Sequence, residues 1–172
     1  SEQTYGKFLT TKYRDEVFLM TKTRARAYKT AEQHLTGSLN RMKTDRLDLW
    51  LMHSVDTAED AKARLENGVL DFMMEAKSKG LVRHIGFSGH ETTAAHLSML
   101  QETDELEVCM MPINVVDTGY DSFIANVLPE LQKQKKGVIA MKTLAGGAFF
   151  GRGFDGRSDA EDTVMDHISV QE

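Results

Sequence analysis

The sequence predicts an α/β fold with a parallel sheet, and more narrowly an incomplete (β/α)8 TIM barrel of about five parallel strands with flanking helices. Three observations predict it: short apolar runs alternate with longer amphipathic stretches, the runs recur at a nearly constant interval, and each run ends on a polar residue. Alternating strand and helix patterns are typical of parallel sheets, because two parallel strands need a long crossover that is usually helical.

The five apolar runs are the expected strands, and their last residues set the interval. The runs read EVFLMTK, LDLWLMH, VRHIGFS, EVCMMPIN and GVIAMK, and they end at Lys22, His53, Ser88, Asn114 and Lys142. These ends are 31, 35, 26 and 28 residues apart, and a barrel of ~250 residues divides into eight units of ~31. A doubly wound open sheet is the structural alternative, but the glycine-rich turn that usually follows its first strand, GxGxxG or GxxxxGKS/T, is missing after EVFLMTK; the GxGxxG spacing occurs only in GRGFDG (151–156), beyond the last run.

The stretches between the runs show the spacing of three to four residues that marks a buried helix face. The spaced apolar residues are Leu35, Leu39 and Met42; Leu70, Phe72, Met73 and Ala76; Leu97 and Leu100; and Val127, Leu128 and Leu131. Gly80 and Gly137 each follow a lysine-bearing stretch, so we expect helices to stop there.

Five units account for most of the chain, whereas a complete barrel needs eight. We therefore expect residues 1–172 to form one partial barrel domain that is truncated at both ends. Ser169 and Glu172 have the S-x-x-E spacing of a capping box, which indicates a helix about to begin where the sequence stops.

Composition excludes several classes of protein. The 21 lysines and arginines are outnumbered by 26 acidic residues, the net charge is −5 and no basic block occurs, so we expect no nucleic acid partner. No apolar stretch approaches the ~18 residues of a membrane span, so we expect no membrane association. The lone Cys109 excludes an internal disulfide and a CxxC site, which favours a reducing, cytoplasmic setting. No two histidines have ligand-like spacing beside a carboxylate, so we expect no metal site.

The polar residues that end the runs are the candidates for chemistry. In a (β/α)8 barrel the C-terminal ends of the strands meet at one mouth, where the active site lies. Each candidate has a structural alternative: a lysine can be a solvated strand end, a histidine a satisfied structural residue, and a serine or asparagine a strand terminator that binds backbone. Recurrence of all five at one depth of a repeating unit favours the functional interpretation.

Five motifs in register resemble the successive strands of the aldo-keto reductase family. They are RDEVFLMTKT (14–23), LDLWLMH (47–53), RHIGFSGH (83–90), MPINV (111–115) and GVIAMKTLAGG (137–147), and together they span nearly the whole chain. The resemblance implies an NADPH-dependent carbonyl reductase with a catalytic tetrad of Asp, Tyr, Lys and His. Lys22 falls on the lysine position of that tetrad and His53 on the histidine position.

The resemblance also implies what these two residues do. In the family, hydride from the nicotinamide reaches the carbonyl carbon while a tyrosine gives its proton to the carbonyl oxygen. An ammonium such as that of Lys22 favours the tyrosinate and so lowers the tyrosine pKa from its ordinary ~10. An imidazole such as that of His53 can hydrogen-bond the carbonyl oxygen and orient it.

For the cofactor, Ser88 matches the family's serine that binds the nicotinamide carboxamide, but the asparagine that usually follows is replaced by Gly89. This departure removes half of the usual clamp, and His90 is the candidate that can supply another donor. Asn114, at the end of the next motif, is a further cofactor-binding candidate. Met141 falls where an aromatic residue often stacks on the nicotinamide, so the ring would meet a polarizable thioether instead.

The stretch Lys142–Gly147 matches the family's loop around the cofactor pyrophosphate. Small residues let backbone N–H groups approach an anion and the lysine adds a positive charge, so Lys142, Leu144 and Gly146 are expected to bind the cofactor. The alternative is that Gly146 and Gly147 merely begin a flexible glycine-rich segment.

Together these features predict an NADP(H)-dependent oxidoreductase of the cytoplasm that reduces small aldehydes or ketones. Residues 1–172 alone are expected to be inactive, because only Lys22 and His53 of the tetrad are present. Two alternatives stay open. One is a regulatory barrel that binds NADPH without turnover, a role also known in the family, and the other is a metal-dependent hydrolase that uses His53 on the same fold.

Tyr5 precedes Gly6, and a Tyr-Gly pair marks the proton donor in this family, but the spacing argues against that role. A helix, two loops and a strand would have to fit between Tyr5 and Lys22, which takes ~25–30 residues, and only 16 intervene. We therefore expect Tyr5 on the family's second helix, where Phe8 and Leu9 at i+3 and i+4 complete an apolar face toward the barrel.

Overall fold

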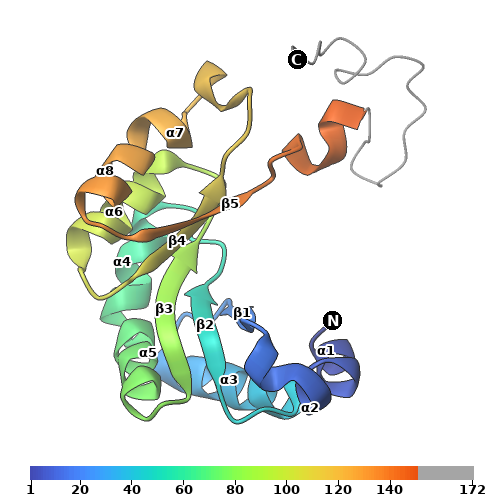
Figure 1. Cartoon of the computed structure of the whole chain (residues 1–172). Coiled ribbons are helices and arrows are strands. Elements are labelled where there is room, and N and C mark those ends of the chain that lie inside the picture. The colour runs from blue at the N-terminus through green and yellow to red at the C-terminus, as the bar shows by residue number, and fades with distance from the viewer. Residues whose placement is uncertain (151–172) are drawn as a thin grey trace.

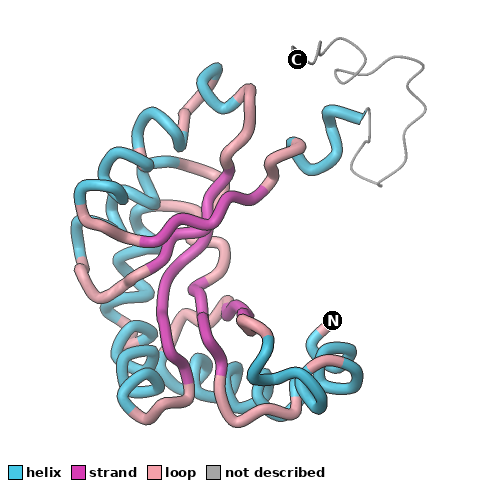
Figure 2. The backbone as a smooth tube through the Cα atoms, viewed as in Figure 1, coloured by secondary structure: helices cyan, strands magenta, loops and turns pink. Residues whose placement is uncertain are grey.

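The computed structural model describes residues 1–150, whose strands form one parallel sheet (Figure 1, Figure 2). The strands are β1 (Met20–Thr23), β2 (Leu47–Met52), β3 (Val82–Ser88), β4 (Val108–Pro112) and β5 (Gly137–Met141). Neighbouring strands are parallel and their order across the sheet follows the chain. A sequential order is that of a barrel wall, whereas a doubly wound sheet reverses its order at a switch point. The predicted five-stranded part of a (β/α)8 barrel is therefore confirmed.

The crossovers between strands are helices that lie along one face of the sheet (Figure 1). They are α3 (Tyr28–Met42), α4 (Ala58–Glu66), α5 (Val69–Ser78), α6 (Thr93–Glu102), α7 (Phe123–Asn126) and α8 (Leu128–Lys133). Two more helices, α1 (Glu2–Phe8) and α2 (Thr10–Tyr13), precede β1, and short 3-10 segments cover Arg14–Glu16, Asp117–Gly119 and Ala145–Phe150. α4 and α6 begin after threonines whose hydroxyls accept a hydrogen bond from a backbone N–H in the first turn, which is the chemistry of a good N-cap.

The two faces of the sheet carry separate apolar clusters. The larger cluster lies between the sheet and the helices and includes Trp50 and Phe72, whose rings meet edge to face at 6.0 Å. The smaller cluster, on the inner face of the barrel wall, is built on Leu49, Leu51 and Met110. Successive residues of a strand point to opposite faces, so any residue in register with Leu49 or Leu51 belongs to the inner face.

The residues of the predicted helix faces are buried or partly buried, but one of the two expected helix stops differs. Gly80 follows α5 with φ 73°, as predicted. At the other site α8 ends at Lys133, the left-handed residue is Lys135, and Gly137 opens β5. The N–H of Lys136 bonds back to the Leu131 carbonyl at 2.9 Å, so the helix is already closed before the glycine is reached.

The helix around Tyr5 is confirmed, but the apolar face expected for it is wrong. Tyr5 and Phe8 are 46% and 61% exposed, whereas Gly6 is buried. A Cβ atom added at Gly6 would lie 2.2 Å from the carbonyl oxygen of Arg41 in α3. The missing side chain therefore brings the two helix backbones together, and this close approach turns the aromatic residues outward.

Ser169 and Glu172, which carry the predicted capping box, lie outside the described residues. Across residues 1–150, no helix is both long enough and apolar enough to cross a lipid bilayer.

Candidate active site

The C-terminal ends of β1, β2 and β3 place three of the predicted residues at neighbouring positions. Lys22 is half-buried and pairs in register with Leu51, which puts it on the inner face. His53 follows β2 directly, and its N–H donates to the Thr23 carbonyl at 2.7 Å, extending the ladder by one residue. Ser88 is the last residue of β3 and is fully buried. The sheet thus gathers a lysine, a histidine and a serine at one edge.

His53 and Ser88 are in direct contact across the strand ends. The Nδ1 atom of His53 lies 3.2 Å from the Ser88 Oγ atom, which is also 3.2 Å from the Met52 carbonyl oxygen. The serine has one hydroxyl hydrogen, so it can donate to only one of these two acceptors. When it donates to Nδ1, the neutral imidazole keeps its hydrogen on Nε2 and can donate to a carbonyl oxygen. Ser88 is thus positioned to select the tautomer of His53.

The environment keeps His53 neutral near pH 7. Burial lowers the pKa of its imidazole below the ordinary value, and the positive charges of Lys22 and Arg24 act in the same direction. A neutral imidazole can accept or donate a hydrogen bond without carrying charge into the half-buried mouth.

Arg64 holds the backbone beneath His53, and its role was not predicted from the sequence. Its side chain is fully buried, and its guanidinium donates to the carbonyl oxygens of His53 at 2.8 Å and Ser54 at 2.6 Å. Asp60, one helical turn earlier, pairs with the same guanidinium at 2.7 Å. Ser54 has φ 54°, a left-handed backbone that costs energy for a serine and that these bonds stabilise. The only sequence signal was the i,i+4 spacing of Asp60 and Arg64, which is also common on solvated helix faces.

A cavity of about 540 Å³ brings together three further predicted residues: His90 after β3, Asn114 after β4 and Lys142 after β5. Nδ1 of His90 lies 2.9 Å from a Glu91 carboxylate oxygen. Asn114 Oδ1 accepts the Val116 N–H at 3.0 Å, so this residue terminates its strand, as its structural alternative proposed. Its placement in the cavity wall leaves the cofactor role open as a prediction.

The loop from Lys142 to Gly147 has an unusual backbone. Lys142, Ala145, Gly146 and Gly147 all have positive φ, from 50° to 102°. The N–H groups of Ala145 and Gly147 donate within the loop, to the carbonyl oxygens of Lys142 at 2.8 Å and Leu144 at 2.9 Å, so an anion would meet only the other N–H groups of this turn. A Cβ atom at Gly146 would meet nothing within 4 Å, and the Leu144 side chain is exposed. Met141, just before the loop, packs against the inner-face cluster.

The packing around position 89 leaves no room for a side chain. A Cβ atom there would lie 2.3 Å from the Val55 carbonyl oxygen and 2.8 Å from Cε1 of His96. His96 is fully buried, and its ring stands edge to face with Phe123 at 4.9 Å. The asparagine usual in the family therefore does not fit here unless the backbone at Val55 moves.

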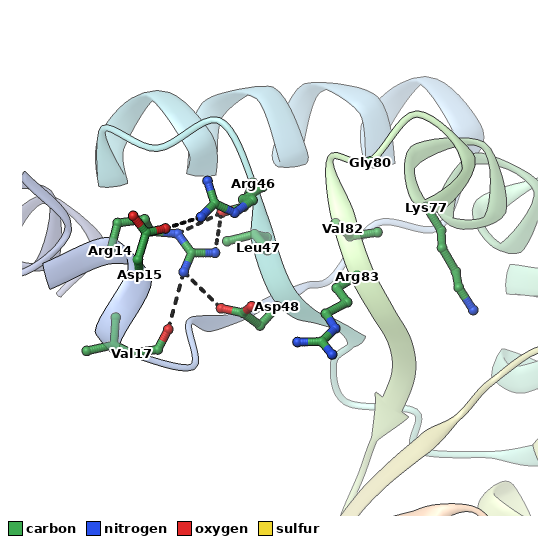
Figure 3. A pocket seen from close by; sticks show the side chains of 10 residues that line it. All are labelled: Arg14, Asp15, Val17, Arg46, Leu47, Asp48, Lys77, Gly80, Val82 and Arg83. Atoms are coloured by element: carbon green, nitrogen blue, oxygen red, sulfur yellow. Dashed lines mark hydrogen bonds and ion pairs between the residues drawn. The ribbon is translucent and has the colours of Figure 1, made fainter.

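A second cavity, of about 590 Å³, lies at the opposite end of the strands (Figure 3). There Arg14 pairs with Asp48 at 3.0 Å and donates to the carbonyl oxygens of Val17 and Arg46. Asp48 also accepts the Leu19 N–H at 2.8 Å. These bonds join the segment before β1 to the start of β2, which is consistent with a structural role for Asp48 at the stability face of the barrel. Among residues 1–150, no three His, Cys, Asp or Glu side chains gather closely enough to hold a metal ion.

The chain is similar to known proteins in sequence and in structure. The sequence profile described as the Aldo/keto reductase family matches residues 1–166. No curated protein sequence gives a significant match.

Several solved structures share the fold. A protein of Pseudomonas aeruginosa described as an aldo-keto reductase has 25% identity and a TM-score of 0.69, with 84% of this chain and 57% of that chain covered. The holo form of the aldo-keto reductase AKR11C1 from Bacillus halodurans has 22% identity and a TM-score of 0.71, with 86% and 48% covered. An aldo-keto reductase from Klebsiella pneumoniae, solved in complex with NADPH, has 23% identity and a TM-score of 0.68, with 90% and 51% covered. The chain thus spans about half the length of these structures.

Proposed function

The chain belongs to the aldo/keto reductase family, and on this premise we propose that it contributes to an NADP(H)-dependent oxidoreductase that reduces small aldehydes or ketones. The observation that carries the proposal is the contact between His53 and Ser88 beside Lys22, at the C-terminal ends of three adjacent strands. This is the edge of a barrel wall where catalytic groups gather.

Each of the three residues has a task that its surroundings support. His53, neutral because of burial and nearby positive charge, donates from Nε2 to the substrate carbonyl oxygen when Ser88 donates to Nδ1. Lys22, on the inner face, lowers the pKa of the tyrosine that protonates the carbonyl oxygen. NADPH, when bound, supplies the hydride.

The residues proposed to hold the cofactor fit an anionic dinucleotide in part. The loop from Lys142 to Gly147 combines one exposed cation with a run of left-handed backbone, and Gly146 leaves open space beside it. Leu144 is exposed on the same loop, and Met141 lies at its base. The carboxamide clamp departs from the family because Gly89 has no side chain, and we assign the second donor to His90, which lies half-buried in the cavity wall with Asn114.

Two members of the tetrad, the Asp and the Tyr, have no counterpart within residues 1–172. We therefore expect no turnover from this chain by itself. Cys109 is the single cysteine, so no internal disulfide can form; this suits a reducing compartment, and we place the activity in the cytoplasm.

The proposal is tested with a complete barrel that contains residues 1–172 together with the tetrad Asp and Tyr. NADPH consumption with an aromatic aldehyde is measured at 340 nm for the unmodified sequence, for Lys22→Met and for Lys12→Met, which changes an exposed lysine on α2. We expect Lys22→Met to lower kcat by at least about a hundredfold and Lys12→Met to leave it unchanged. Turnover that survives Lys22→Met would contradict the mechanism, and NADPH binding without turnover would favour the regulatory alternative.

A further inference from the structure

The mouth of the barrel wall carries one positive charge, that of Arg24, which the proposed reduction does not use. The chain as a whole has a net charge of −5, yet its strand ends carry Lys22 in β1, Arg24 just after β1 and Lys142 after β5. Arg26, nearby, is paired with Asp60 at 2.7 Å. Within residues 1–150, Arg24 has no such carboxylate partner. A guanidinium that is both exposed and unpaired at the edge of an active site is available to a ligand.

The backbone places Arg24 directly beside His53. Thr23 pairs in register with Met52, and the His53 N–H donates to the Thr23 carbonyl at 2.7 Å, so the next residue of each strand stands opposite the other. The Thr23 hydroxyl accepts the Ala25 N–H at 3.1 Å, which fixes the turn that carries Arg24.

The alternation of side chains along β1 shows to which face of the sheet each residue belongs. The hydroxyls of Thr21 and Thr23 bond to Glu2 of α1 at 2.6 Å and His34 of α3 at 2.8 Å, on the helix side of the sheet. Lys22 lies between these threonines in β1 and therefore belongs to the side of the mouth. Arg24 follows the last strand residue and is exposed. The charge of Arg24 reaches the imidazole, because after burial and Lys22 it is the next contributor that lowers the pKa of His53.

We propose that Arg24 selects carbonyl substrates that carry a carboxylate or a phosphate. The guanidinium binds the anionic group through parallel N–H bonds, while His53, one strand away, faces the carbonyl oxygen. The inference rests on the proposed function, since it takes His53 to mark the place of the reacting carbonyl.

The cofactor's own phosphates are a less suitable ligand for Arg24. The loop proposed for the pyrophosphate follows β5, and three strands lie between β1 and β5 in the sheet. Arg24 and Lys142 thus stand on opposite flanks of the mouth, with His53 beside the first and His90 in the same cavity wall as the second. Two separate anions, one on the cofactor and one on the substrate, match this distribution of charge.

The experiment uses the 172-residue chain and needs no turnover. Three probes share a benzyl alcohol and differ in the opposite substituent: 4-(hydroxymethyl)benzoate, 4-(hydroxymethyl)phenyl phosphate and the neutral 4-methylbenzyl alcohol. Binding is followed through the NMR signals of the His53 imidazole in the unmodified chain, in Arg24→Gln and in Arg83→Gln. Arg83 is a matched control, because it is exposed and lies at the opposite end of the strands (Figure 3).

We expect the anionic probes to bind about fivefold more tightly than the neutral probe, the upper range for an exposed ion pair. Arg24→Gln should remove the difference, Arg83→Gln should retain it, and added salt should shrink it. A preference for only one of the two anions identifies carboxylate or phosphate as the group selected. Equal binding of all three probes, no response of His53, or a preference that survives Arg24→Gln would overturn the inference.

This outcome is independent of the reductase assay. If probe binding shows a charge preference that depends on Arg24 but the complete barrel shows no turnover, only the proposed reduction is contradicted. If the complete barrel turns over but shows no such preference, only the role of Arg24 is contradicted.

Discussion

Replacing Arg64 with leucine tests the claim that a buried guanidinium holds the active-site edge in place. The substitution removes hydrogen bonds to two carbonyl oxygens, at 2.8 Å to His53 and 2.6 Å to Ser54, from a side chain with no solvent exposure. Asp60 keeps a second partner in Arg26 at 2.7 Å, so the carboxylate is not left alone. The main cost is therefore two carbonyl groups without donors and a left-handed Ser54 that loses its support.

The magnitude follows from these contacts. An unsatisfied buried carbonyl costs about 1–3 kcal/mol, and breaking a buried ion pair costs about 3–5 kcal/mol. Because Asp60 retains Arg26, we expect a loss near the lower end, about 3 kcal/mol. With a urea m-value of about 2 kcal/mol/M, the midpoint of unfolding should fall by about 1.5 M.

The assay is urea unfolding followed by circular dichroism, with Arg83→Leu as the control for an exposed arginine. NMR titration of His53 gives a second measurement. Arg64 is one of the positive charges that lower the pKa of His53, after burial, Lys22, Arg24 and His90, so this pKa should rise in the leucine variant. A midpoint shift no larger than that of Arg83→Leu, which should stay within about 0.5 kcal/mol, together with an unchanged His53 pKa, would refute the reasoning.

Three further predictions concern groups around the site. Burial lowers the pKa of His96 to about 4. Because the folded state then binds fewer protons than the unfolded state, the contribution of His96 to stability should be complete above about pH 6.5 and fall by about 3 kcal/mol as the pH drops toward 4. Urea unfolding at several pH values should show this dependence, and His96→Leu should flatten it. Gly89→Asn should destabilise the chain by about 1–3 kcal/mol in thermal unfolding, because its Cβ would meet the Val55 carbonyl oxygen at 2.3 Å; equal stability would show that the backbone there yields. Cys109 is buried and its thiol pKa is raised by that burial, so iodoacetamide should label it only after unfolding, and rapid labelling of the folded chain, read by mass spectrometry, would contradict its placement.

The order of the strands and the depth of the candidate residues were predictable because both are local properties. An apolar run such as LDLWLMH needs burial on both faces of a parallel sheet, and its polar last residue marks where burial ends. Repetition of that pattern at a near-constant interval was enough to predict that Lys22, His53 and Ser88 lie at one edge of the sheet.

The apolar face expected for the helix of Tyr5 failed for a reason that no local pattern contains. Helical spacing groups Tyr5 with Phe8, but it does not state how closely another backbone approaches. Gly6 lets α1 contact the backbone of α3 at Arg41, which is 36 residues from Tyr5 in the sequence. That contact decides which side of α1 is buried.

The sequence by itself determined the family, the five parallel strands and the identity of the polar residues at their ends, because strand burial repeats with the chain and polar residues interrupt it at fixed points. Only the tertiary structure decided what those residues touch. The contact of Ser88 with Nδ1 of His53 and the space denied to a side chain at Gly89 depend on contacts between different βα units, and the position of Arg64 beneath His53 depends on the path of the loop that joins β2 to α4. Such contacts leave no periodic trace in the sequence. Every residue has a backbone carbonyl, and its residue type does not reveal whether that carbonyl accepts a hydrogen bond or is closely approached by another backbone.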